Sequence, residues 1–318
     1  MGGNAVWGAV YALIAFAIFS THDVVVKFLG SQYHAIQIIF FSVLFGFPLV
    51  LLMLIRDRTD GNLRPVHPWW TALRTAAALV TGVTAFYAFS VLPLAQTYAI
   101  LFATPLLITV LAIPILGEKV GIRRGLAVLV GMIGVLIVLR PGSEPLSLGH
   151  GAALMAAVCS SFASVVVRKI GQEERAAVLL IFPMMANFVV LGAALPFVYV
   201  PMPIDHLGLV GIIALFGFVA MLFVIAAYRD APAVVVAPMQ YSQMIWAAIF
   251  GAVIFDETPD VWTMAGAAVI IASGLYIVLR EGRPTVSANT PVLQTQSRPD
   301  TGIWPRISTL MGRTGRRD

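Results

Sequence analysis

Ten long apolar runs determine what this chain can fold into. Each is about 20 residues long, the length that an α-helix needs to cross the hydrocarbon core of a bilayer. Short segments, several with Pro or Gly, separate the runs, which lie at about 6–29, 35–55, 69–90, 94–116, 121–139, 150–168, 176–200, 207–228, 233–255 and 261–279. Backbone groups in hydrocarbon must be hydrogen-bonded within the segment. The sequence therefore predicts an all-α integral membrane protein with ten transmembrane helices.

The composition agrees with a membrane protein and excludes a soluble domain. Hydrophobic residues make up 59% of the chain and charged residues only 11%, whereas soluble domains carry about a quarter charged residues. The net charge of +5 comes mostly from the segment after Gly282, so the basic character gives no reason to expect a nucleic-acid partner. The single Cys159 excludes an internal disulfide framework and a Cys-based metal cluster.

Basic residues are distributed very unevenly between the two sides of the predicted membrane. If the N-terminus lies in the cytoplasm, 18 of the 20 Lys and Arg residues fall on the cytoplasmic side, and only Lys27 and Arg140 fall outside. Positively charged loops are retained in the cytoplasm during membrane insertion. We therefore expect both termini in the cytoplasm and the protein in the inner (plasma) membrane.

Two stretches that follow long apolar runs share a pattern but differ in charge. "ILGEKVGIRRG" (115–125) contains three bases, whereas "IFDETPDVWTMAG" (254–266) contains three acids and no base. They follow the fourth and the ninth predicted helix, so five crossings turn the second copy over and one loop faces the cytoplasm while the other faces outward. The halves align at an offset of 139 to 141 residues. The sequence predicts two inverted five-helix repeats, 1–142 and 143–282, followed by a disordered basic cytoplasmic tail, 283–318.

The same stretches carry a resemblance to a known family. The run "TPLLITVLAIPILGEKVGIRRGLAVLVGMIGVLIV" (104–138) and its weaker partner around Glu257 resemble the EamA branch of the drug/metabolite transporter superfamily. The run "HDVVVKFLGSQYHAIQIIFF" (22–41) is also similar to the start of S-adenosylmethionine uptake carriers. The resemblance implies a central cavity lined by helices one to four and six to nine, with helices five and ten at the periphery. Many relatives have an Arg in the second helix where this chain has Ser42.

The candidate substrate-binding residues lie on the fourth and ninth predicted helices, which the resemblance makes the central pair. Pro105 and Pro238 interrupt these helices, and a proline in a span frees a carbonyl that a cavity or a partner can accommodate. The expected substrate contacts are Thr97, Tyr98, Thr104, Gln240, Gln243 and Trp246. Thr104 and Gln243 are counterparts in the repeat. The alternative is that these groups only hydrogen-bond between helices; Asn187, Ser160, Ser161 and Ser164 are weaker candidates.

Asp23 is the only acid expected inside a predicted span, and His22 precedes it. An ionisable side chain at membrane depth is a candidate functional group, so Asp23 with His22 is a candidate coupling site, with protons as the coupling ion. The alternative is an i,i+4 ion pair between Asp23 and Lys27 that stabilises the helix end. The sequence shows no His or Cys at a spacing that would make His22 a metal ligand.

These observations predict a secondary transporter that moves a small organic metabolite, amino-acid- or nucleoside-like, by alternating access. An intramembrane enzyme would need a second acid or a nucleophile and base at depth, and the sequence offers neither. A channel would show a ring of like charge or a filter loop. The expected partners are a small-molecule substrate and the lipid bilayer, with neither cofactor nor metal; a homodimer is compatible with the sequence.

Overall fold

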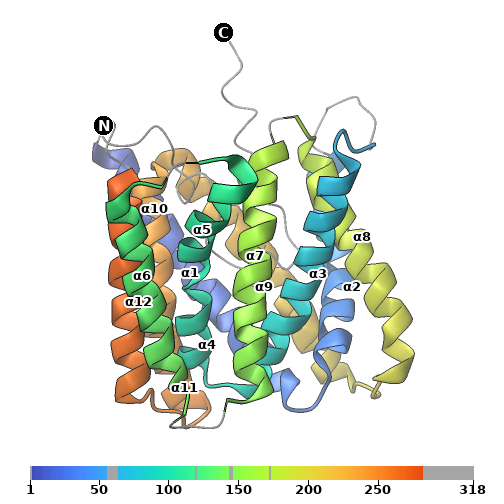
Figure 1. Cartoon of the computed structure of the whole chain (residues 1–318). Helices are drawn as coiled ribbons and strands as arrows, with labels where there is room; N and C mark the ends of the chain where they lie inside the picture. Colours follow the sequence, from blue (N-terminus) through green and yellow to red (C-terminus); the bar gives the residue numbers. More distant parts are fainter. Residues whose placement is uncertain (1, 56–63, 119, 143–145, 172, 282–318) are drawn as a thin grey trace.

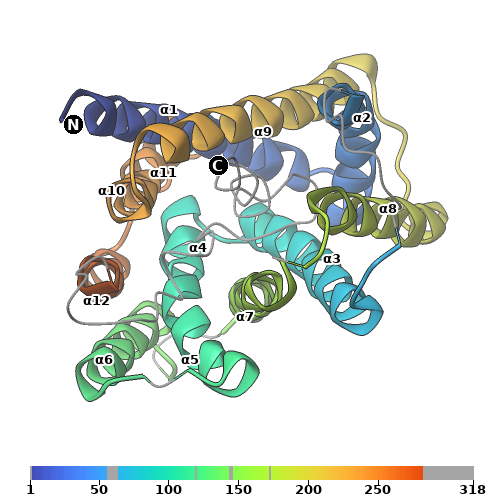
Figure 2. The same ribbon diagram turned by 90° about the horizontal axis from the view of Figure 1, so that it is seen from above.

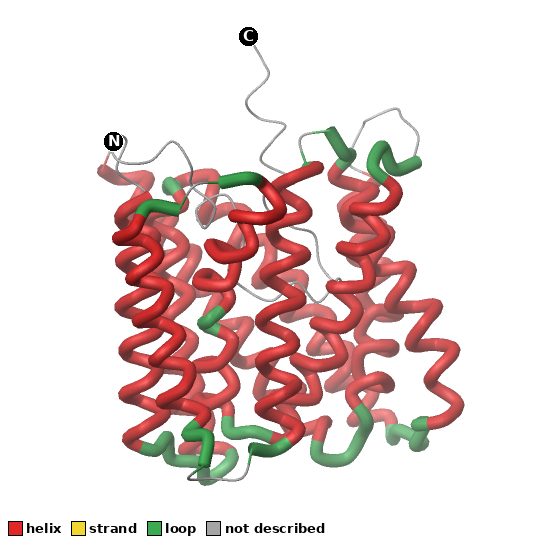
Figure 3. The backbone as a smooth tube through the Cα atoms, viewed as in Figure 1, coloured by secondary structure: helices red, strands yellow, loops and turns green. Residues whose placement is uncertain are grey.

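The structure, a computed structural model, describes residues 2–55, 64–118, 120–142, 146–171 and 173–281. These residues form helices and connecting turns, and no strand occurs among them (Figures 1 and 3). The elements are α1 (Gly2–Gly30), α2 (Ala35–Ile55), α3 (Pro68–Val91), α4 (Leu94–Leu101), α5 (Thr104–Leu116), α6 (Ile122–Leu139), α7 (Leu148–Ile170), α8 (Ala176–Ala194), η1 (Leu195–Phe197), α9 (Ile204–Asp230), α10 (Ala233–Met239), η2 (Gln240–Ser242), α11 (Gln243–Ile254) and α12 (Val261–Glu281).

The prediction of an all-α membrane protein is confirmed. Nine helical segments of the described chain are long and apolar enough to cross a bilayer, and α2 supplies a tenth with its apolar stretch Ala35–Leu51. Two spans are built from two helices each: α4 with α5, and α10 with α11. The predicted tail, 283–318, lies outside the described residues.

The fourth span breaks where a proline prevents the α-helix from continuing. Pro105 has no N–H to bond the carbonyl of Leu101, and its ring would clash with that carbonyl. The helix stops at Leu101 and restarts at Thr104, whose Oγ1 donates a hydrogen bond of 2.7 Å to the Leu101 carbonyl. The side chain before the proline thus supplies the partner that the backbone lost.

The ninth span breaks at the counterpart position, although its proline lies on the other side of the break. Its 3-10 turn covers Gln240–Ser242, and α11 begins at Gln243, the repeat counterpart of Thr104. Pro238 precedes this turn instead of following it. Both halves therefore keep a broken helix at the same place while using different residues to break it.

The helix neighbours follow the symmetry of the inverted repeat. Helix α1 packs on α9, and their counterparts α7 and α3 pack on each other. Counterpart spans also pack in pairs: α2 with α8, the broken fourth span with the broken ninth through α4 and α11, and α6 with α12. Figure 2 shows α6 and α12 together at one end of the molecule, away from α2 and α8. The expected peripheral place of the fifth and tenth spans agrees with this arrangement.

The ten spans bring the start of α1 and the end of α12 to the same face (Figure 1). We call this the terminal face, and the other the distal face. The turn after α5 lies at the terminal face, and the turn between α11 and α12 lies at the distal face. The two loops whose opposite charge suggested the inversion therefore lie on opposite sides of the molecule.

One boundary of the sequence prediction was wrong. The seventh span was expected to continue to residue 200, but α8 ends at Ala194 and a 3-10 turn, Leu195–Phe197, follows. Pro196 explains the difference, because a proline removes a helical hydrogen bond and clashes with the carbonyl four residues earlier.

Glycines hold α6 and α12 at close distance. A Cβ built on Gly266 would lie 2.5 Å from Val138 Cγ2 and 2.7 Å from the carbonyl oxygen of Gly134, and one on Gly134 would lie 2.9 Å from the carbonyl oxygen of Gly266. Small residues allow such backbone contact between membrane helices. By contrast, nothing lies within 4 Å of the Cβ position of Gly125, which is also in α6.

We predict that Gly266→Ala destabilises the protein while Gly125→Ala does not. The first substitution forces α6 and α12 apart, which costs about 1–3 kcal/mol for an overpacked contact. The second adds a methyl group in open space and favours the helix by roughly 0.5–1 kcal/mol. Melting temperatures in detergent check this, and equal temperatures for both variants would contradict the packing account.

Candidate functional site

The two broken spans meet at their breaks. Phe102, in the break of the fourth span, packs edge-to-face on Tyr241, in the break of the ninth, with ring centroids 5.1 Å apart. Phe102 and Tyr241 are repeat counterparts at the offset of 139 residues. The axis that relates the two halves therefore passes close to this aromatic contact.

A chain of buried polar side chains joins α1, α4 and α11 beside the breaks. The hydroxyl of Tyr98 donates a short hydrogen bond to Asp23 Oδ2, and Gln243 Nε2 donates to the Tyr98 oxygen at 3.3 Å. His22 Nδ1 lies 2.8 Å from Asp23 Oδ1. Each of these four side chains belongs to a residue at most 5% exposed. A carboxyl, a phenol, an amide and an imidazole thus share one buried network.

A second polar cluster lies where the repeat places the counterpart of the first. Thr104 Oγ1 lies 3.5 Å from Ser160 Oγ, and Ser161 Oγ donates 3.1 Å to the carbonyl of Thr104. These contacts join α5 to α7. In the first network, Gln243 of α11 bonds Tyr98 of α4, which bonds Asp23 of α1. The second cluster contains only hydroxyl side chains, so the ionisable groups lie on one side of the axis.

The structure brings together some of the sequence-predicted site residues and separates others. Asp23, His22, Tyr98 and Gln243 form one network, whereas Thr104 belongs to the hydroxyl cluster. The remaining three predicted residues have other surroundings: the Thr97 hydroxyl bonds the Pro93 carbonyl at 3.1 Å, Gln240 is buried in the break of the ninth span, and Trp246 is half-buried and stacks on Phe250 with centroids 5.7 Å apart.

Lys27, the alternative partner of Asp23, is held by groups from outside α1. Lys27 Nζ lies 2.8 Å from Glu257 Oε1 and donates a hydrogen bond of 2.5 Å to the Leu92 carbonyl. The i,i+4 spacing allowed the local pair, but the turn after α11 brings a second carboxylate to Lys27. Asp23 has Tyr98 and His22 as hydrogen-bond partners.

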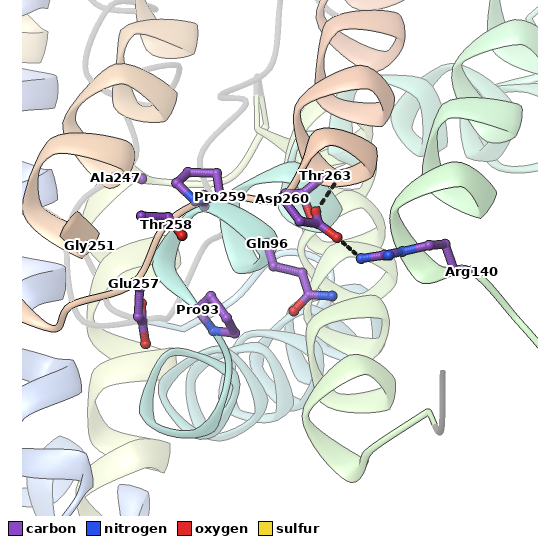
Figure 4. Close-up of a pocket in the computed structure, with 11 residues that line it drawn as sticks. Pro93, Gln96, Arg140, Ala247, Gly251, Glu257, Thr258, Pro259, Asp260 and Thr263 are labelled. Atoms are coloured by element: carbon purple, nitrogen blue, oxygen red, sulfur yellow. Dashed lines mark hydrogen bonds and ion pairs between the residues drawn. The ribbon is translucent and has the colours of Figure 1, made fainter. Parts of the chain in front are cut away.

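A pocket of about 200 Å³ lies at the distal face. It lies between the start of α4, the end of α6 and the turn from α11 to α12 (Figure 4). Arg140 and Asp260 form an ion pair at its edge, and Glu257 and Gln96 are among its lining residues. Polar and charged groups therefore line the pocket on the side where Lys27 meets Glu257.

Sequence reasoning missed two kinds of residue. The sequence analysis gave no partner to Glu118 and Glu257, whose side chains pair with Arg168 and Lys27. The hydroxyl of Ser242, in the break next to Gln243, is buried and has no hydrogen-bond partner among the described residues. The sequence did contain a signal for the two glutamates, because they are counterparts at the repeat offset of 139 residues. Within the described chain, no group of three His, Cys, Asp or Glu side chains is arranged to hold a metal ion.

Comparisons with known proteins agree with this architecture. The model of the EamA-like transporter family matches residues 6–140 and again 147–280. A solved crystal structure superposes on 86% of this chain and 96% of its own, with a TM-score of 0.58 and 16% identity, a level at which the likeness concerns the fold alone.

Curated relatives are similar over most of the chain. An S-adenosylmethionine uptake transporter of Rickettsia bellii is 26% identical over 86% of this chain and 94% of its own. A riboflavin transporter of Brucella anthropi is 27% identical, with shares of 78% and 89%. The pseudopaline exporter CntI of Pseudomonas aeruginosa is 25% identical, with shares of 84% and 94%. With both halves matched by the family model, the chain belongs to the EamA-like transporter family, and it is a membrane transporter of small metabolites rather than an enzyme.

Proposed function

We propose that this protein is a secondary transporter that carries a small organic metabolite across the inner membrane by alternating access, with the substrate held between the two broken spans. One observation carries the proposal: both central spans are interrupted at counterpart positions, beside a buried polar network. Transporters with inverted repeats bind substrate at such discontinuous helices, where half-helix ends and freed backbone groups face the ligand.

The chemistry of the network favours an amino-acid-like or nucleoside-like substrate. Amide, phenol and hydroxyl groups of Gln243, Tyr98 and Thr104 offer both hydrogen-bond donors and acceptors. Asp23 is the one carboxyl in the network, and it would suit a cationic or zwitterionic group better than an anion. The relatives named above carry S-adenosylmethionine, riboflavin and pseudopaline, which are organic metabolites with several polar groups.

Asp23 is the proposed coupling residue. A buried carboxyl that gains and loses a proton changes both its charge and its ability to accept the Tyr98 hydrogen bond. Because Tyr98 also accepts from Gln243, a change at Asp23 would reach the ninth span through one side chain. This path gives a proton a physical means to alter the substrate site.

We predict that Gln243→Leu weakens substrate binding while Gln37→Leu does not. Gln243 bonds within the proposed site, whereas Gln37 is equally buried but bonds the backbone of Val200 in both directions, at 2.7 and 2.9 Å. Loss of one hydrogen bond to a buried ligand costs about 1–3 kcal/mol, which is roughly 5- to 150-fold in affinity. The affinity of purified protein for metabolites that raise its melting temperature checks this.

Unchanged affinity in folded Gln243→Leu would move the site away from the ninth span. Thr104→Val tests the hydroxyl cluster in the same assay. Because valine keeps the shape of threonine but cannot bond the Leu101 carbonyl, its melting temperature is measured beside its affinity.

A second prediction concerns pH. We expect Asp23→Asn to abolish the pH dependence of transport, because asparagine keeps the acceptor for Tyr98 but cannot exchange a proton. Uptake into proteoliposomes over a range of external pH, with equal protein levels, measures this. A pH profile that is the same in the variant and the parent would exclude Asp23 as the proton-coupling group.

The terminal face is proposed to be cytoplasmic, on the uneven distribution of bases. Reporter fusions after Gly61, Pro203 and Gly282 should give cytoplasmic, external and cytoplasmic signals. An external signal after Gly282 together with a cytoplasmic one after Pro203 would reverse the orientation.

A further inference from the structure

Two ion pairs join the halves of the protein, one at each face. Glu257 pairs with Lys27 at the distal face, with Nζ and Oε1 2.8 Å apart, and Glu118 pairs with Arg168 at the terminal face. Under the repeat offset, Glu118 corresponds to Glu257 and Lys27 corresponds to Arg168. The two pairs are therefore copies of one another, and each connects a glutamate of one half to a base of the other.

The same backbone turn positions both glutamates. Gly117 and its counterpart Asp256 have left-handed φ angles of 70° and 56°. The N–H of Glu118 then bonds the carbonyl of Ala112 at 3.4 Å, and the N–H of Glu257 bonds the carbonyl of Gly251 at 2.8 Å. In each turn the N–H of the glutamate thus bonds the carbonyl six residues earlier and closes the C-terminus of the helix, and Gly117 has the left-handed conformation that is common just after a helix end. Asp is one of the few non-glycine residues that adopt this conformation, so the second turn keeps the left-handed residue of the first without a glycine.

Each pair clamps a broken span to the helix that carries its polar cluster. At the distal face, α1 carries Asp23 one turn from Lys27, and the turn at Glu257 ends the helix that carries Gln243. At the terminal face, α7 carries both Ser160 and Arg168, and the turn at Glu118 ends the helix that carries Thr104. Each of the two buried polar clusters thus shares its helices with one of the ion pairs.

Neighbouring contacts strengthen both clamps. The second carboxylate oxygen of Glu257 accepts the N–H of Leu94 at 3.2 Å, so the distal pair also holds the start of α4. At the terminal face, Lys169 Nζ donates to the carbonyl of Ile115 at 2.7 Å and lies 4.6 Å from the ring centroid of Trp70. Lys27 and Glu118 are each only 8% exposed. A group this buried is costly to leave without its counter-charge.

We propose that these two pairs are the gates of the transporter, which separate one at a time: Lys27–Glu257 to open the path from the distal face, and Arg168–Glu118 to open it from the terminal face. The proposal rests on the proposed function of alternating access. Both pairs are formed together in this structure, as the proposal requires of the state that lies between the two open ones. Because each broken pair leaves a poorly solvated charge, breaking both at once is disfavoured, and this keeps the two openings exclusive.

The test uses matched variants and needs neither a substrate nor the membrane orientation. In a Cys159→Ser background, single cysteines replace Ala247 in α11 and its repeat counterpart Ile108 in α5, which are 1% and 0% exposed. The rate of labelling by a charged, water-soluble maleimide in detergent then reports access from each face. Glu257→Gln and Glu118→Gln break one pair each, and glutamine keeps the size and an acceptor oxygen.

We expect Glu257→Gln to raise the labelling rate at Ala247→Cys on the order of tenfold and to leave or lower the rate at Ile108→Cys. Glu118→Gln should do the reverse. The charge exchange Lys27→Glu with Glu257→Lys should return the Ala247→Cys rate toward the parent value. If Glu118→Gln does not fold, Arg168→Gln breaks the same pair from the other side.

Two results would overturn the gate proposal. One is an equal rise at both positions in each variant, which would mean general loosening and would accompany a lower melting temperature. The other is unchanged labelling at both positions in folded variants. Transport that persists with unchanged labelling would reject the gates but leave the carrier function standing. The expected labelling pattern in a protein that transports nothing in a metabolite panel would reject the function instead.

Discussion

A polar group in the hydrocarbon core must find a partner within the protein, and this requirement shapes the centre of the molecule. Breaking the fourth and ninth spans frees backbone groups that an intact helix would have satisfied. Thr104 provides for the Leu101 carbonyl, and Ser161 from α7 reaches the carbonyl of Thr104. The hydroxyl groups that satisfy the freed carbonyls therefore also connect α4, α5 and α7 around the break. A substrate that binds at the breaks would replace some of these hydrogen bonds with its own.

The fold is nearly symmetric, but its chemistry is not. Helix pairs, span breaks, helix caps and the two cross-repeat ion pairs all have counterparts in the other half. The counterpart of Asp23 is Ser164, whose hydroxyl bonds the carbonyl of Ser160 on its own helix at 2.6 Å. Symmetry thus supplies two equivalent ion pairs, whereas Asp23 and His22 put ionisable groups on a single side of the axis. That combination suits a carrier whose two states are alike in shape but differ in charge.

Sequence reasoning reached the spans and their inversion because both leave periodic and local signals. Apolar length gave ten helices, and loop charge gave the inverted repeat. Sequence reasoning failed where the partners are distant in the chain. Lys27 has an acid at the favourable i−4 spacing, yet it pairs with Glu257. Asp23 bonds Tyr98, which lies on another helix. The early end of α8 was different, since Pro196 was visible in the sequence and its effect on the helix is local.

The central claim is that this chain is a carrier with one site that faces the two sides in turn, and solute counterflow in proteoliposomes tests it most directly. Vesicles loaded with an unlabelled metabolite are diluted into the same labelled compound, over a panel of amino-acid-like and nucleoside-like solutes. The account predicts transient, saturable accumulation of label for at least one compound, driven by exchange on a shared site. Flux of that compound that rises linearly with concentration, without acceleration by internal solute, would indicate a pore and contradict the account.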